Sequence, residues 1–180
     1  MKFYSKRNNV QLVNGQVHKC SPTALIEAQL LRQLHANGVG VPQVISAQHK
    51  LLVLEYLPGT PLPDVVESGD YNPVLLAQAL CIWFAAFSQA CPGMLRGDVN
   101  GRNFLYDGTQ IFAVDFEEHL QPGSLTCDCG RLAAFLATYD TPHRAKQTQL
   151  VHALMQHHGY PVHAFLAELV AMRNRRACSN

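Results

Sequence analysis

The chain has few charged residues, and those that it has are balanced in sign. Only 15% of its 180 residues are Asp, Glu, Lys or Arg, and the formal net charge is +1. A protein that binds nucleic acid through a broad surface needs an excess of positive charge on one face. We therefore expect no nucleic-acid partner. The hydrophobic fraction of 48% is sufficient for a folded core, so we expect one domain, or two small lobes that share a groove.

Paired cysteine motifs are also missing. The chain has six cysteines, and the two that lie nearest to each other, Cys127 and Cys129, are spaced too closely for a typical zinc-binding pair. We expect free thiols, which persist in a reducing compartment, and hence a cytoplasmic location. The first residues lead into a polar stretch and show no secretory signal, which agrees with this expectation.

The longest stretch without any charge covers residues 71–95. Pro73, Gln78 and Pro92 interrupt it, so its strictly apolar part is shorter than the ~20 residues that a membrane span requires. The stretch predicts a helix over about residues 73–90 that is buried on most of its sides. We expect no membrane partner.

The first third of the chain predicts strands around a single helix. Residues 10–20 alternate apolar with polar side chains on both sides of Asn14-Gly15, which is typical of a hairpin. Ser21 and Pro22 predict the N-cap and the first residue of a helix, and Asn37-Gly38 predicts its end. Further strands are expected over residues 41–45 and 50–56.

The remainder is predicted to be mainly helical. The proline-rich segment 57–63 is expected to form a loop, and we divide the chain there into lobes of residues 1–57 and 58–180. A second hairpin is expected over residues 103–114, with its turn at Asp107-Gly108. Helices are expected over residues 73–90, 124–139, 144–158 and 161–176.

Three polar residues around this second hairpin have a spacing that indicates chemistry. Asp98 follows Gly97, Asn103 comes five residues after Asp98, and Asp115 ends an apolar run. Phosphoryl transfer from a nucleotide needs one carboxylate that orients the attacking hydroxyl, together with an amide oxygen and a second carboxylate that hold magnesium. Asp98 is therefore the candidate catalytic residue, and Asn103 and Asp115 are the candidate magnesium ligands.

These residues, in Gly97-Asp98, Asn103 and Val114-Asp115-Phe116, resemble the corresponding motifs of the protein-kinase-like phosphotransferase superfamily. The chain is similar to the aminoglycoside and choline phosphotransferases, and to compact atypical kinases such as the RIO kinases and the kinase of the tRNA threonylcarbamoylation complex. The resemblance covers about residues 17–135. It implies a two-lobed α+β fold with a small antiparallel-sheet N-terminal lobe and a mainly helical C-terminal lobe, and ATP and Mg²⁺ as cofactors.

The resemblance also implies which residues bind the nucleotide. Lys19 would contact the phosphates and would be held by Glu27 on the following helix. Main-chain groups of Glu55 and Leu57 would bind adenine at the connection between the lobes. Asp128 would brace the catalytic loop through backbone amides without taking part in catalysis.

The sequence departs from the family pattern in three places. Arg96 stands where the family usually has His, so we expect it to alter the catalytic loop or to reach a phosphate. The first nineteen residues contain only one glycine, Gly15, so the usual glycine-rich phosphate loop is missing. Phe116-Glu117 follows Asp115 in place of Phe-Gly, and the segment up to Asp128 is too short for a groove that binds an extended peptide.

We therefore expect an ATP- and Mg²⁺-dependent phosphotransferase that acts on a hydroxyl group of a small molecule. A compact atypical kinase with a protein Ser or Thr as acceptor is one alternative. The other is a kinase-fold module that binds a nucleotide or a partner without catalysis. The presence of Asp98, Asn103 and Asp115 together argues against this last alternative.

Overall fold

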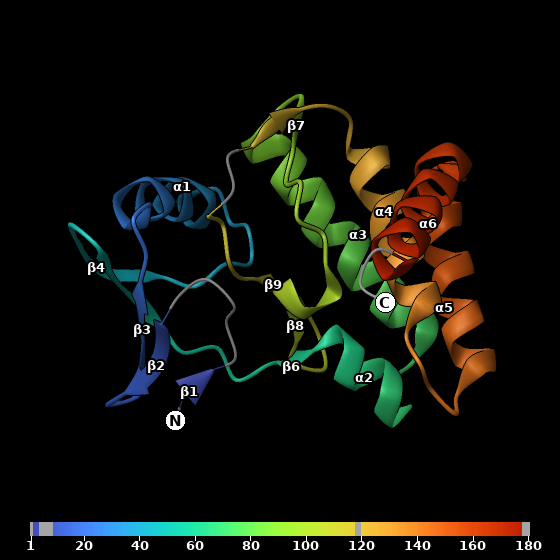
Figure 1. Cartoon of the computed structure of the whole chain (residues 1–180), viewed down its shortest axis with the longest axis horizontal. Coiled ribbons are helices and arrows are strands. Elements are labelled where there is room, and N and C mark those ends of the chain that lie inside the picture. Colours follow the sequence, from blue (N-terminus) through green and yellow to red (C-terminus); the bar gives the residue numbers. More distant parts are fainter. Residues whose placement is uncertain (1, 4–8, 118–119, 178–180) are drawn as a thin grey trace.

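The computed structural model of the chain describes residues 2–3, 9–117 and 120–177. A strand-rich N-terminal part and a helical C-terminal part lie side by side (Figure 1). The N-terminal part is an antiparallel sheet of five strands in the order β1-β2-β3-β5-β4. This arrangement confirms the predicted α+β fold with two lobes. The strands are β1 (Lys2–Phe3), β2 (Asn9–Val13), β3 (Gln16–Cys20), β4 (Val44–Gln48) and β5 (Leu51–Glu55).

Helix α1 (Ala24–Ala36) is the single helix of this part among the described residues, and it packs against β4 and β5. Leu31 and Leu34, spaced by three residues on one face, are buried in the core. The helix ends at Asn37 as predicted, and Gly38 adopts a left-handed φ of +74°, a conformation that glycine adopts without steric cost.

One helix and one strand of this part begin at residues other than those predicted. The N-cap of α1 is Thr23, and Ser21 lies outside the helix, where its hydroxyl accepts a hydrogen bond from the Thr23 amide at 3.2 Å. The strand predicted over residues 41–45 begins only at Val44. Pro42 has no N–H for a strand ladder, and Val41 is buried in the core before the strand begins.

The C-terminal part contains the four helices predicted from the sequence, with ends that differ by at most one residue. Helix α4 packs against α5 and α6, and α3 packs against α5. A Cβ atom at Gly130 of α4 would lie only 2.9 Å from the Cβ of Ala164 in α6, so this glycine permits the close approach of the two helices. The helices are α3 (Pro73–Ala90), α4 (Leu125–Thr138), α5 (Arg144–His157) and α6 (Val162–Ala177).

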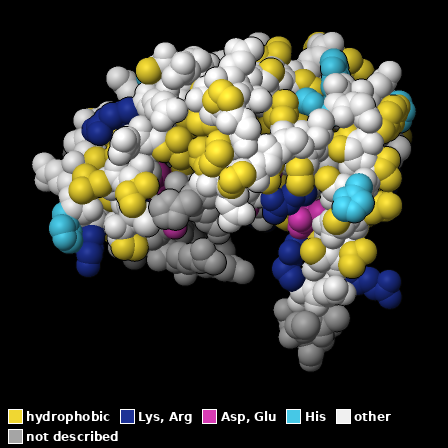
Figure 2. All heavy atoms as spheres, turned by 90° about the horizontal axis from the view of Figure 1, so that it is seen from above, with side chains coloured by type: hydrophobic (Ala, Val, Ile, Leu, Met, Phe, Trp, Pro, Cys, Tyr) yellow, Lys and Arg dark blue, Asp and Glu magenta, His cyan; other side chains and the backbone are white. Residues whose placement is uncertain are grey.

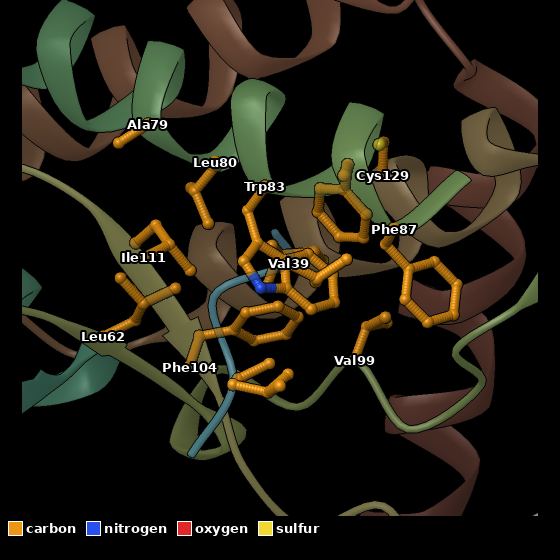
Figure 3. Close-up of a cluster of buried hydrophobic side chains, with 14 of the residues drawn as sticks. Val39, Leu62, Ala79, Leu80, Trp83, Phe87, Val99, Phe104, Ile111 and Cys129 are labelled. Atoms are coloured by element: carbon orange, nitrogen blue, oxygen red, sulfur yellow. The ribbon is translucent and has the colours of Figure 1, made fainter. Parts of the chain in front are cut away.

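Helix α3 provides the centre of the hydrophobic core (Figure 3). The ring of Trp83 lies 5.4 Å from that of Phe87 and 5.2 Å from that of Phe104, measured between centroids. The indole Nε1 of Trp83 donates to the carbonyl of Gly40 at 2.8 Å, and the Ala113 amide donates to the same carbonyl at 2.8 Å. The loop after α1 is thus bonded to the helical part of the chain.

Helix α3 is less buried than predicted. It is the one helix among the described residues that is long and apolar enough to cross a membrane, a property shared by core helices of globular proteins, and 44% of it is buried inside the fold. Leu75 and Ile82 are exposed. Hydrophobic side chains also spread over much of the face shown in Figure 2, with Lys and Arg in small separate groups.

Several short elements were not predicted. Helix α2 (Leu62–Ser68) begins inside the segment expected to be a loop, and strand β6 (Thr60–Pro61) precedes it. Strand β6 joins the predicted hairpin to form the sheet β6-β8-β9, so the predicted lobe boundary after residue 57 falls between the two sheets and stays a prediction. The remaining elements are β7 (Met94–Leu95), the 3-10 helix η1 (Gly101–Asn103), β8 (Phe104–Tyr106), β9 (Ile111–Ala113) and β10 (Gln121–Pro122).

Candidate active site

The candidate active site lies where β3, α1 and the segment after β9 meet, and Lys19 is at its centre. Lys19 is only 5% exposed on β3. Its ammonium Nζ donates to Glu27 Oε1 at 2.9 Å and to Asp115 Oδ1 at 2.7 Å. Glu117 Oε1 lies 2.7 Å from the same atom. One cation therefore faces three carboxylates, and the cluster has an excess of negative charge.

Glu27 accepts two hydrogen bonds at one oxygen of its carboxylate. It is 1% exposed on α1, and its Oε1 accepts a second hydrogen bond from the Phe116 amide at 3.0 Å. Burial alone would lower the pKa of Lys19, but the charges of Glu27 and Asp115 outweigh it, so the pKa of Lys19 lies above its usual value. Burial raises the pKa of Glu27, although Lys19 opposes this effect. The structure thus forms the predicted Lys19–Glu27 pair.

The catalytic loop orients Asp98 through two hydrogen bonds. Its Oδ2 accepts from Asn103 Nδ2 at 2.9 Å, and its Oδ1 accepts from the Asn100 amide at 3.2 Å. Asn103 makes this hydrogen bond through Nδ2. Its Oδ1, the atom with which an amide binds a metal, takes no part in this contact. The structure therefore brings Asp98 and Asn103 together, as their spacing predicts.

Asp115 lies two residues after the end of β9 and has a left-handed backbone, at a φ of +65°. A non-glycine residue adopts this conformation only at a cost, and here Arg96 holds the surrounding backbone. Nη2 of Arg96 donates to the carbonyl of Val114 at 2.6 Å and lies 3.3 Å from that of Asp115. The side chain of Asp115 is 46% exposed, so a metal ion can reach it.

Arg96 is buried, which argues against one of the two expectations for it, namely that it reaches a phosphate. Its guanidinium lies over the rings of Phe104 and Phe116, at 5.1 Å and 4.8 Å from their centroids. Its backbone amide donates to Asp128 Oδ2 at 2.7 Å. Burial raises the pKa of Asp128, and this hydrogen bond opposes the shift. Asp128 thus braces the start of the catalytic loop, as expected.

Glu55 is the last residue of β5, and Leu57 lies on the connection from β5 to β6. The Glu55 amide already donates to the carbonyl of Gln43 at 2.9 Å, and its side-chain Oε2 accepts from the Gln43 amide at 3.2 Å. The N–H of Glu55 is thus unavailable to a nucleotide base. Leu57 is buried between β5 and β6. Adenine binding by the main chain of these residues stays a prediction.

Two residues of the site were missed from the sequence. Glu117 was noted only as a departure from Phe-Gly, and its contact with Lys19 depends on folding across the two lobes. Tyr139, at the end of α4, accepts a hydrogen bond from the Gly101 amide in the catalytic loop at 3.0 Å. Burial raises the pKa of Tyr139 to about 12. No local signal marks this tyrosine, because its partner lies 38 residues earlier.

The residues present fit magnesium in their chemistry. Within the described part of the chain, no three His, Cys, Asp or Glu side chains form a ready metal cage. Magnesium does not need one, because it keeps waters and takes oxygens from its substrate. Asn103 and Asp115 offer hard oxygen donors, and the excess negative charge around Lys19 favours a divalent cation.

A family model for the RIO domain matches residues 4–148. The EKC/KEOPS complex subunit BUD32 of Encephalitozoon cuniculi (strain GB-M1) is 31% identical to this chain over 108 residues. That region is 60% of this chain and 49% of the relative, so the match spans about half of the relative's length.

Solved structures of kinases and phosphotransferases share the fold. A ternary complex of streptomycin, ATP and APH(2")-IIa matches with a TM-score of 0.62 at 11% identity, covering 92% of this chain and 81% of the other. A choline/ethanolamine kinase family protein from Mesorhizobium loti gives 0.60 at 14% identity, covering 87% and 69%. The Rio2 kinase from Chaetomium thermophilum gives 0.59 at 14% identity, covering 97% and 71%.

These identities are too low to show more than a common fold, but the family model covers most of the chain. Together with the site geometry, it confirms the resemblance to compact atypical kinases that was inferred from Asp98, Asn103 and Asp115. The chain belongs to the RIO domain family, within the kinase-like phosphotransferases.

Proposed function

We propose that this protein transfers the terminal phosphate of ATP to a hydroxyl group, with Mg²⁺ as its metal. The observation that carries the proposal is the convergence of Lys19, Glu27 and Asp115 in one hydrogen-bonded cluster. The Asn103 carbonyl accepts a hydrogen bond from the Val114 amide at 2.9 Å, which joins this cluster to the loop that carries Asp98.

Each residue would have a defined part in the reaction. Asp98, oriented by Asn100 and Asn103, would accept a hydrogen bond from the acceptor hydroxyl and take its proton. Lys19, kept protonated by its carboxylate neighbours, would hold phosphate oxygens. Asn103 and Asp115 would hold magnesium, which supplies positive charge to offset the negative charge on the transferred group. Catalysis of this kind depends mainly on positioning and charge.

We further propose a protein Ser or Thr as acceptor. Membership of the RIO domain family and the likeness to a subunit of a protein complex support this choice. They also support a protein partner for this chain. The free thiols among the described cysteines support a cytoplasmic location.

A small-molecule hydroxyl is the second candidate acceptor. The short segment between Asp115 and α4 favours it, since β10 pairs with β7 and leaves little chain for a peptide-binding groove. Labelling separates the protein acceptor from the small-molecule acceptor. The protein is incubated with γ-labelled ATP, first alone, then with cell proteins, and then with aminoglycosides and choline. Label on protein supports the first acceptor, and label only on a small molecule supports the second.

Thermal unfolding tests the shared part of the proposal. ATP with Mg²⁺ should raise the melting temperature of the wild type, because a ligand that binds only the folded state stabilises it. Asp115→Ala should remove the part of this shift that depends on Mg²⁺. The exposed Asp64→Ala on α2 is the matched control and should keep it. If nucleotide and Mg²⁺ leave the wild-type melting temperature unchanged up to millimolar concentration, the proposal fails.

A further inference from the structure

The two carboxylate oxygens of Asp128 have different surroundings. Oδ2 accepts the hydrogen bond from the Arg96 amide, at 2.7 Å, that braces the start of the catalytic loop. Oδ1 is buried, and within the part of the chain that the structure describes no hydrogen-bond donor reaches it. A buried carboxylate is costly unless a cation pairs with it. The cation that faces Oδ1 is Arg131, whose Nη1 lies 3.7 Å away.

Arg131 is held in this place by a second helix. It lies three residues after Asp128 on α4, and its Nε donates to Oε2 of Glu168 on α6 at 3.2 Å. Glu168 is buried, and its other oxygen, Oε1, accepts from Arg175 Nη2 at 2.6 Å. The guanidinium of Arg131 therefore lies between two carboxylates, one from each helix. The contact with Glu168 restricts the rotamers of Arg131 and keeps Nη1 beside Asp128.

The charge on Asp128 depends on these neighbours. Burial raises the pKa of Asp128, and the hydrogen bond from the Arg96 amide and the charges of Arg131 and Arg96 oppose this shift. Glu168 reaches Asp128 only through Arg131. The thiol of Cys129, the next residue, stays neutral near neutral pH because burial raises its pKa. An ionised carboxylate accepts a stronger hydrogen bond from an amide than a protonated one, so a cation that keeps Asp128 ionised also strengthens the brace.

We propose that Arg131 is a positioning residue of the catalytic loop, which keeps the carboxylate of Asp128 charged and in place and thereby holds the backbone that leads to Asp98. The inference rests on the proposed function for its effect on phosphoryl transfer, whereas the effect on the loop is measured without any substrate. Arg131 lies outside the Lys19 cluster, so its loss should lower the rate of transfer and leave the affinity for nucleotide nearly unchanged.

Hydrogen exchange of backbone amides tests the effect on the loop. Arg131→Met removes the guanidinium and keeps much of the side-chain length. Amides of residues 94–103 should exchange about fivefold faster than in the wild type near neutral pH, the factor expected for a partly exposed ion pair, and those of α3 should be unchanged. The difference should widen as the pH falls, because Asp128 without Arg131 is protonated at a higher pH. Arg173→Met, at an exposed position of α6, is the control and should match the wild type.

The Asp128→Asn background separates an action through Asp128 from a general loss of packing between α4 and α6. Asparagine keeps an oxygen that can accept from the Arg96 amide but carries no charge. In this background Arg131→Met should therefore change the exchange of the loop by about twofold at most, with no dependence on pH. An equal effect of Arg131→Met in both backgrounds would overturn the inference. Exchange in α3 that accelerates as much as in the loop would also overturn it, because the loss would then be global.

Two further variants at this position keep the test decisive. Arg131→Lys retains the positive charge, so its loop amides should exchange within about twofold of the wild-type rate. Arg131→Gln removes the charge but keeps a polar side chain, and it takes the place of Arg131→Met if that variant does not fold. A lysine variant that exchanges as fast as the uncharged variants would contradict the role of the charge.

Transfer of labelled phosphate from ATP, to protein or to water, tests the effect on the reaction. In Arg131→Met, kcat should fall about fivefold, and KM for ATP should change by about twofold at most. An unchanged kcat, or a loss confined to KM, would overturn the inference and leave the proposed function intact. If the wild type neither binds nor turns over ATP, the proposed function fails, and the exchange rates alone decide whether Arg131 holds the loop.

Discussion

The guanidinium of Arg96 and the backbone of Asp115 are bonded to each other across the floor of the site. Nη2 of Arg96 donates to the Val114 carbonyl at 2.6 Å and lies 3.3 Å from the Asp115 carbonyl. These two carbonyls flank the left-handed residue that would bind magnesium. Since Arg96 lies two residues before Asp98, the contact links the catalytic loop to the segment after β9 that is expected to bind magnesium.

Replacement of Arg96 should therefore destabilise the fold. Arg96→Met keeps much of the side-chain length but removes every side-chain donor, which takes from the part-buried Val114 and Asp115 carbonyls their guanidinium partner. We expect the free energy of unfolding to fall by about 2–4 kcal/mol. Urea unfolding followed by the fluorescence of Trp83, the single tryptophan of the chain, measures this change. The exposed Arg144→Met in α5 is the control, with an expected loss below about 1 kcal/mol. A similar loss in both variants would contradict the role of Arg96.

Asp98→Asn should separate catalysis from binding. The amide cannot take the proton of the acceptor hydroxyl, so the rate of phosphoryl transfer should fall by about 100-fold or more. The affinity for nucleotide and Mg²⁺ should stay close to that of the wild type, because Asp98 lies outside the Lys19 cluster. Transfer assays with labelled ATP and calorimetry on the same samples test both halves. A variant that retains full activity would exclude Asp98 as the catalytic residue.

Tyr139→Phe should loosen the catalytic loop. The phenol oxygen accepts the hydrogen bond of the Gly101 amide, and its loss should cost about 1–2 kcal/mol of unfolding free energy. The pKa of Tyr139, raised to about 12 by burial, adds a pH signature. Since the raised pKa lies above that of an unfolded tyrosine, its stabilising contribution is complete below about pH 10 and is lost as the pH rises through 12.

The measurement is an absorbance titration of the tyrosinate band. The wild type should show one tyrosine that titrates near pH 12, and Tyr139→Phe should lack it. Tyr56→Phe is the control, since that side chain is exposed. A high-pH transition that persists in Tyr139→Phe would assign it to another residue.

Gly130→Val should disrupt the packing of α4 against α6. A Cβ at this position meets the Ala164 Cβ and the Pro161 carbonyl, both at 2.9 Å, so the helices would have to move apart. We expect a loss of about 1–3 kcal/mol in unfolding free energy. Ala85→Val, at an exposed position of α3, controls for the lower helix propensity of valine. Unfolding midpoints that agree for the two variants would contradict the close contact.

Much of the fold could be predicted from the sequence because it depends on local patterns. The turn residues Asn14-Gly15 and Asp107-Gly108 define the two hairpins, and periodic apolar residues define the long helices. Helix α2 was missed because Pro61 and Pro63 were interpreted as breakers, although proline is tolerated in the first turn of a helix. Strands β7 and β10 have two residues each and exist only through their mutual pairing, which no local pattern indicates.

The residues of the candidate site, like the elements of the fold, could be predicted from the sequence only in part. Asp98, Asn103 and Asp115 could be found because phosphoryl transfer imposes both their types and their order. The structure adds the hydrogen bond between Asp98 and Asn103 and the Lys19 cluster. Glu117 and Tyr139 could not be found, since their partners lie far away in the sequence. The burial of Arg96 also depends on the aromatic rings that the fold brings to it.

The pairing of β6 with β8 has a consequence for how the two ends of a nucleotide would be held. Thr60, three residues after Leu57, is paired with Tyr106, three residues after Asn103. Leu57, one of the two residues expected to bind the base, and Asn103, expected to bind the metal, thus flank one small sheet, whose hydrogen bonds fix the distance between them. Lys19 and Glu55 belong to the other sheet. If the two sheets shift relative to each other during a catalytic cycle, Lys19 and Glu55 move together, while Leu57 and Asn103 keep their spacing.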